Sequence, residues 1–195
     1  MPLYRRDEPA RCRLAVLGRA GLSACQNKKK DWAMPEITLL GWIHTGIAIV
    51  ALVAGFYTLA VYKVIRPSQR TGRLYLICTL IAAVTALMIY KHGGFGPAHG
   101  LAVLTLLALA AGFIVTRIPA ITQSAKYLEA FFFSGTLLFH MIPAITDGLL
   151  RLPVGSPILT NPLDPMLRKF YLAFLLIFVV GYVLQFRWLK RQASK

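Results

Sequence analysis

Long apolar runs separated by short polar segments make up nearly all of the chain after its first 33 residues. A helix that crosses a bilayer needs roughly 20 mostly apolar residues. Five stretches meet this need, and they cover residues 37–62, 74–90, 98–116, 127–145 and 170–189. The pattern therefore predicts an all-α fold, an integral membrane bundle of about five transmembrane helices.

Helix-breaking residues end these runs. Pro67 and Gly72 stop helical continuation within the basic segment 63–73, and a glycine-rich turn at 93–97 separates the second run from the third. Pro119 helps to close the third run. We expect residues 34–195 to form one transmembrane helical domain, because no remaining stretch is long enough for a soluble one.

Residues 1–33 differ from the rest, since they hold eight of the 22 lysines and arginines and no long apolar run. Two interpretations are open: a disordered basic tail, or an upstream extension of a chain that begins at Met34, which we favour. Residues 22–25 resemble a lipoprotein cleavage box, but Arg19 interrupts the apolar stretch that such a box needs.

Composition agrees with a membrane protein, because 57% of the residues are hydrophobic and only 15% are charged, against about 25% charged in soluble domains. A net charge of +15 is also typical of proteins that bind nucleic acid, because lysine and arginine neutralise phosphates. However, the basic residues gather at the ends of apolar runs and in the tail, where topology signals lie. The expected partners are the lipid bilayer and other membrane subunits, and no nucleic acid.

The basic residues also predict an orientation. Without residues 1–33, ten of them fall on one side of the membrane and four on the other. Because positive residues accumulate on the cytoplasmic side, the C-terminus is expected in the cytoplasm of a bacterial inner membrane. If residues 1–33 are counted, the other side gains eight, the balance becomes twelve to ten, and the signal is lost.

Four histidines are the candidate chemistry: His44, His92, His99 and His140. In five spans of alternating direction, all four fall toward one membrane face, whichever way the bundle is oriented. His44 lies about seven residues inside the start of the first span, and His140 about seven residues before Asp147, which is just past the end of the fourth, so both are expected roughly 10 Å below that face. His92 and His99 flank the glycine-rich turn at the face itself.

An imidazole inside lipid is costly unless it has a partner. Two imidazoles at matched depth on antiparallel helices predict an axial pair for haem b, or ligands for another transition metal. His44 and His140 are the predicted ligands, with His92 and His99 as supporting or propionate-facing groups. The competing interpretation is hydrogen bonding between helices for the deeper pair, and a headgroup location for the other two.

The neighbours of the two deeper histidines refine this site. Asp147 is predicted to orient an imidazole from the second shell of ligands, or to pair with Arg151. Small residues share the helical face of His44, and they predict close approach by another helix or by a flat macrocycle. These residues are Gly41, Ala48, Ala51 and Gly55.

Three classes of function follow. The leading hypothesis is a redox or metal-handling role within a larger membrane system. A rival is a non-catalytic component, such as a structural subunit or a small transporter without a cofactor. A third is an enzyme acting on lipid or quinone, with the histidines in acid–base roles, so enzymatic activity stays open. Glu129 is predicted to take part in proton transfer, or simply to reach water or Lys126.

Two short segments carry a resemblance. Residues 44–48, Gly55 and residues 70–75 resemble a family of bacterial multi-pass proteins known only as predicted membrane proteins of unknown function. In that family an early helix carries a histidine, and a loop reading roughly His-Arg-x-x-Gly-Arg-x-Tyr opens the next helix. Gln69 stands where the loop histidine would be, so that role does not carry over. The likeness spans about residues 40–115.

More loosely, the bundle resembles the cytochrome b561 group, in which histidines on neighbouring helices hold haem. That group places haem near both membrane faces, whereas this sequence has histidines toward one face alone. The resemblance therefore implies at most one haem site, and no electron transfer across the membrane by this chain by itself.

Overall fold

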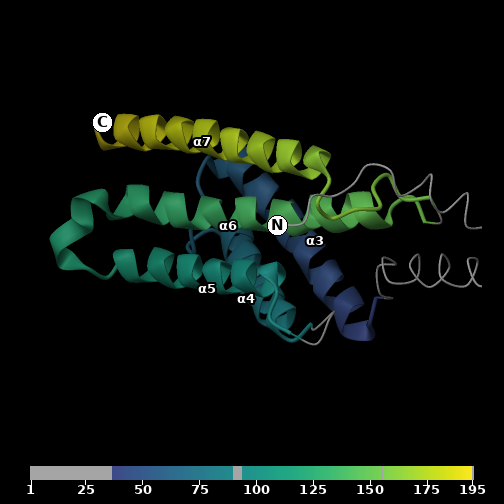
Figure 1. Cartoon of the computed structure of the whole chain (residues 1–195). Helices are drawn as coiled ribbons and strands as arrows, with labels where there is room; N and C mark the ends of the chain where they lie inside the picture. Colours follow the sequence, from purple (N-terminus) through teal and green to yellow (C-terminus); the bar gives the residue numbers. More distant parts are fainter. Residues whose placement is uncertain (1–36, 90–93, 155, 195) are drawn as a thin grey trace, which may run out of the picture. The chain divides into compact units, whose positions relative to one another are not determined.

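The computed structural model describes residues 37–89, 94–154 and 156–194, and in these ranges the chain is helical, with no strand. The predictions for residues 1–33 and for His92 lie outside the described residues. Figure 1 shows the helices, which are α3 (Leu39–Tyr62), α4 (Arg70–Leu87), α5 (Pro97–Val115), the 3-10 turn η2 (Pro119–Ile121), α6 (Thr122–Arg151) and α7 (Pro165–Ala193).

Five of the described helices are long and apolar enough to cross a membrane. This confirms the prediction of an all-α membrane bundle. Large apolar side chains that no protein surface covers, such as Leu172, Ile177 and Val180 on α7, belong to the face that lipid covers.

Helices α3 to α6 close into a ring, in which each packs against the next and α3 also touches α6. Helix α7 lies outside this ring and packs along α6 (Figure 1). Tyr75 from α4 and Phe133 from α6 are fully buried in the ring, and Leu137 from α6 is nearly so. The core of the bundle is therefore built around two aromatic side chains on different helices.

Small residues let the ring close. A Cβ at Gly55 would lie 2.9 Å from the Tyr75 ring and 3.0 Å from Leu137. At Gly112 of α5, an added Cβ would overlap the Phe133 ring. The sequence left open whether the face of α3 that carries these small residues contacts another helix or a macrocycle. Around Gly55 it meets the side chains of two neighbouring helices.

Helices α6 and α7 extend furthest beyond their predicted spans, and α4 begins four residues early, at Arg70. Helix α6 continues through Pro143 to Arg151, where the sequence pattern placed the end near residue 145. Helix α7 begins at Pro165 and not near residue 170, because the Asp164 carboxylate accepts a hydrogen bond from the Met166 N–H (2.8 Å). Aspartate followed by proline is a favoured start of a helix, so the longer α7 was legible in the sequence.

The basic connection between α3 and α4 is a tight structure. Lys63 ends α3 in the left-handed region (φ 68°), and its N–H bonds the Leu59 carbonyl at 3.0 Å. The Gln69 side chain accepts from the Arg66 N–H (3.1 Å). Gly72 lies against the Arg66 carbonyl, where a Cβ would not fit. The segment that carries the family resemblance therefore opens α4 and holds this turn.

Candidate functional site

His44 reaches from α3 to α4. Its Nδ1 lies 3.0 Å from the Thr85 hydroxyl oxygen. The single Thr85 hydroxyl proton points to carbonyl oxygens of its own helix, those of Ile81 (2.9 Å) and Ala82 (3.0 Å). A Thr85 hydroxyl that donates to either carbonyl accepts from His44 Nδ1–H. The bond joins α3 to α4 inside the bundle.

His140 reaches from α6 to α4 and starts a longer network. Its Nε2 lies 3.1 Å from the Thr79 hydroxyl oxygen. Thr79 lies one turn after Tyr75 on α4, so the two side chains share one face of that helix. Tyr75 in turn lies 2.6 Å from the Thr136 hydroxyl, which donates to the Phe133 carbonyl (2.7 Å). We call these four side chains, from His140 to Thr136, the His140 chain.

The carbonyl of Phe133 gives the Thr136–Tyr75 bond its direction, because a carbonyl accepts and never donates. Thr136 gives its proton to that carbonyl, so it accepts from the Tyr75 hydroxyl. Thr79, on the same face of α4 as Tyr75, is hydrogen-bonded to His140 Nε2. The His140 chain therefore consists of two hydrogen-bonded pairs that Tyr75 and Thr79 bring together on α4.

The members of the His140 chain come from two helices that face each other across the ring. Thr79, Tyr75 and Thr136 are fully buried, and His140 is partly buried. The Tyr75 and His140 rings also meet edge to face, with centroids 6.3 Å apart. The chain therefore lies in the apolar interior, where each of these hydrogen bonds must be satisfied within the protein.

The two histidines contact α4 at different heights. Their threonine partners are six residues apart, which is about 9 Å along the helix axis. The sequence pattern had placed His44 and His140 level with each other.

The threonines and Tyr75 were missed as site residues, although the sequence held a signal for them. Thr71, Tyr75 and Thr79 recur every four residues on α4, so they share one face of the helix. Thr71 also lies 2.8 Å from the Thr58 hydroxyl of α3, which is fully buried. A polar stripe on an apolar helix indicates a face that turns to other helices and away from lipid.

The other predicted site residues lie elsewhere. His99 is 4% exposed, and its Nδ1 accepts a hydrogen bond from the Gly96 N–H (3.1 Å) at the start of α5. It serves as a helix cap there. Asp147 lies 3.8 Å from Arg151 Nε within α6, which is one of the two arrangements that the sequence allowed for it.

Glu129 lies on the same face of α6 as Phe133, Thr136 and His140, since they are spaced by four, three and four residues. Its carboxylate is 3.9 Å from Arg66 Nε, and the Glu129 side chain is only 12% exposed. Lys126, the predicted alternative partner, extends over the Tyr127 ring, 5.1 Å from its centroid. Glu129 thus ends the polar stripe of α6 at the basic side of the bundle.

The fit of a metal was tested against this donor set. The described residues contain no group of three or more His, Cys, Asp or Glu that could hold an ion. Haem needs two protein ligands alone, and the two deep histidines are the candidates. Both rings, however, are hydrogen-bonded to threonines of α4 that lie about 9 Å apart along the helix axis. As arranged, the pair fits hydrogen bonding between helices better than a shared iron.

Comparisons with family models, with curated proteins and with solved structures give no match. The resemblance noted for residues 40–115 therefore stays a prediction. What the protein does has to be inferred from its own residues and their contacts.

A double-mutant cycle tests the central bond of the His140 chain. Thr136→Val removes the acceptor of a fully buried tyrosine hydroxyl, and should lower the free energy of unfolding by about 1–3 kcal/mol. Tyr75→Phe should also destabilise, but the double variant should lose less than the sum, by about 0.6–1.5 kcal/mol. Unfolding in mixed micelles, followed by circular dichroism, measures all three.

Thr105→Val is the matched control, because the buried Thr105 hydroxyl donates to Leu101 O of its own helix (2.8 Å). It should show no coupling to Tyr75→Phe. Fully additive losses for Thr136→Val and Tyr75→Phe would mean that the two hydroxyls do not interact in the folded protein.

Proposed function

We propose that this membrane protein moves protons, as a small transporter or as the proton-handling subunit of a redox system. The observation that carries the proposal is the His140 chain in the middle of the helix ring, in which the His140–Thr79 and Tyr75–Thr136 pairs meet on one face of α4. Ionisable groups inside a membrane are rare and typically mark ion pathways or proton relays. Histidine is the side chain best suited to that task near neutral pH.

A proton arriving from the nearer membrane face is taken up by the His140 ring, whose Nε2 faces Thr79. The imidazolium passes a proton to Thr79, Thr79 passes its own to Tyr75 on the same face of α4, and Tyr75 passes its own to Thr136. Thr136 releases its proton to water on the way to Glu129, so one proton enters the chain and one leaves it.

Beyond Thr136 the path reaches Phe133, whose ring is fully buried, before it comes to Glu129. Thr136 and Glu129 are seven residues apart, or about 10 Å along α6. The Phe133 ring is the apolar step between the two polar ends. We propose that a proton crosses when this ring moves aside and water joins Thr136 to the Glu129–Arg66 pair.

The proposal includes an orientation. Lys63, Arg66, Arg187 and Arg191 lie at the end of the bundle opposite to His44. By the accumulation of positive charge on the cytoplasmic side, we assign this end and the C-terminus to the cytoplasm of a bacterial inner membrane. The His140 chain then opens toward the outer face, and Glu129 toward the inside.

Proton flux into vesicles tests the function. Purified protein in liposomes that contain a pH-sensitive dye should acidify the lumen when a potassium diffusion potential drives protons inward. His140→Ala should remove the protein-dependent flux, and Thr79→Val should lower it by about tenfold or more, because relay groups typically contribute at least that much. Thr105→Val should keep the wild-type rate, since its hydroxyl lies outside the chain.

Each variant is first compared with wild type by circular dichroism and gel filtration, so that a loss of flux is not a loss of fold. Wild-type vesicles that acidify no faster than empty ones, under potentials of either sign, would rule the function out. So would a His140→Ala protein that is folded and fully active.

Haem or a transition metal at His44 and His140 is the second candidate. What favours it is that threonines orient both rings, as hydrogen-bonded partners do for metal-ligating histidines. The absorption spectrum of protein purified after haem supply should then show a Soret band, and His44→Ala or His140→Ala should abolish it. Thr105→Val is again the control. A spectrum without that band, together with no bound transition metal by mass spectrometry, would reject the candidate.

Reporter fusions test the orientation. Green fluorescent protein fused after Lys195 should fluoresce, and alkaline phosphatase fused there should be inactive, because that end is assigned to the cytoplasm. Fused after Thr160, between α6 and α7, the two reporters should behave in the opposite way. The reverse pattern at both positions would invert the assignment of the two faces.

A further inference from the structure

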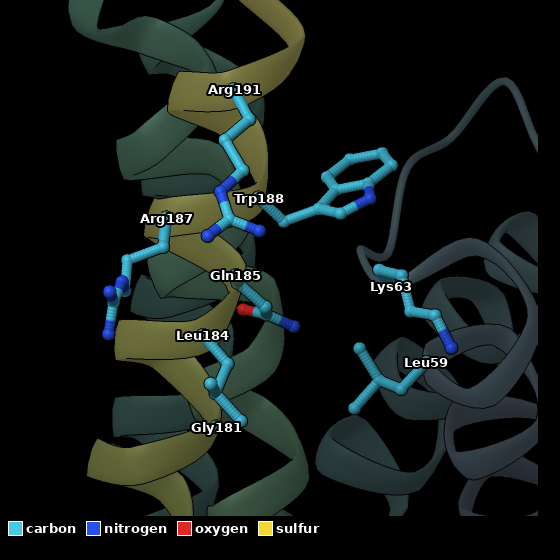
Figure 2. Close-up of a pocket in the computed structure, with 8 residues that line it drawn as sticks. All are labelled: Leu59, Lys63, Gly181, Leu184, Gln185, Arg187, Trp188 and Arg191. Atoms are coloured by element: carbon cyan, nitrogen blue, oxygen red, sulfur yellow. The ribbon is translucent and has the colours of Figure 1, made fainter.

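A groove of about 560 Å³ opens between the end of α3 and the C-terminal half of α7 (Figure 2). Helices α3 and α7 are not neighbours in the packing of the bundle, so their side chains leave a gap. The groove is lined by Leu59, Lys63, Gly181, Leu184, Gln185, Arg187, Trp188 and Arg191. Three of these eight residues are basic, and none is acidic.

The lining changes character along the membrane normal. Leu59 and Leu184 form the apolar part, inside the spans. Lys63 comes one turn after Leu59, and Arg191 two turns after Leu184, close to the ends of their helices. Hydrocarbon and a positively charged end therefore lie in one groove, about 6–10 Å apart. This is the profile of an amphiphile with an anionic head.

Gln185 adds fixed hydrogen-bond donors between these two parts. The residue is 7% exposed, and its Oε1 accepts from the Ser134 hydroxyl of α6 (3.0 Å). That bond turns the amide nitrogen the other way, and Figure 2 shows it directed across the groove toward α3. A buried polar side chain thus presents an N–H donor pair to whatever fills the groove.

Trp188 marks the level of the groove in the membrane. It packs on a small buried cluster of Val64, Ala130 and Leu189, and it also lines the groove. Tryptophan near the end of a span typically lies at the headgroup level of the bilayer. Figure 2 shows Arg191 beside Trp188, while Arg187 points away on the other side of α7. Arg191 on α7 and Lys63 on α3 are therefore the cations on the two sides of the groove, and the Lys63 ammonium donates to the Ala60 carbonyl (2.7 Å).

We propose that this groove binds one anionic phospholipid. Its headgroup phosphate lies between Lys63 and Arg191 and accepts from the Gln185 amide, and an acyl chain runs along Leu59 and Leu184. Basic pockets between transmembrane helices are typical sites for such headgroups. The hydrocarbon half of the groove distinguishes a lipid from free phosphate. The site does not depend on proton movement by the His140 chain.

Tryptophan quenching tests the lipid site directly. The chain has three tryptophans, and the full-length variant Trp32→Phe, Trp42→Phe leaves Trp188 as the one reporter. In mixed micelles, phosphatidylglycerol with brominated acyl chains should quench Trp188 at lower mole fraction than brominated phosphatidylcholine with the same chains. Lys63→Gln or Arg191→Gln should each reduce this preference by about fivefold.

Lys190→Gln is the matched control, because Lys190 is adjacent in sequence but does not line the groove. It should leave the preference unchanged. Equal quenching by the two lipids would overturn the site. An equal loss in Lys190→Gln and Arg191→Gln would also overturn it, since the effect would then be general surface charge. Displacement of the brominated lipid by inorganic phosphate alone would assign the groove to the free ion instead.

Discussion

A bilayer interior offers no water to a polar side chain, and the arrangement of this protein follows from that constraint. Hydroxyls and imidazoles of the inner helices must bond to one another or to carbonyls, since an unmet group in hydrocarbon is costly. Two threonines of α4 provide such hydrogen bonds. Thr85 bonds His44 of α3, and Thr79 bonds His140 of α6. Helix α4 is also the least apolar of the five spans.

The fold was largely predictable, because bilayer thickness sets the length of an apolar run and leaves few alternatives to a helix. The residues at which the helices begin and end were less predictable. Residues 146–151 at the end of α6 carry charge and look like a connection, yet Asp147 and Arg151 pair along a helical turn. For α7, Asp164 and Pro165 indicate where the helix starts, but a hydropathy pattern does not take an N-cap residue into account.

The candidate site was predictable in part. Hydropathy and alternation brought the deep histidines to the same half of the bundle, and hydrogen bonding between helices was among the interpretations. Depth along each helix, however, says nothing of tilt or of which neighbour a ring meets. That choice is made by packing, where Gly55 admits the Tyr75 ring and thereby brings α4 to the centre. Threonines also occur throughout apolar sequences, so the sequence alone does not show which of their hydroxyls bond to another helix.

Three polar contacts tie α7 to α6 at separate heights. They join Tyr171 to Thr146 (2.6 Å), Gln185 to Ser134 (3.0 Å) and the Tyr182 hydroxyl to the Tyr127 carbonyl (3.3 Å). Two apolar helices without polar contacts can slide and rotate against each other at little cost. Hydrogen bonds at several positions along both helices fix their register. A slip by one turn, about 5.4 Å, would break all three contacts together. Helix α7 is therefore fixed in its register and rotation on α6, and its other side faces the lipid.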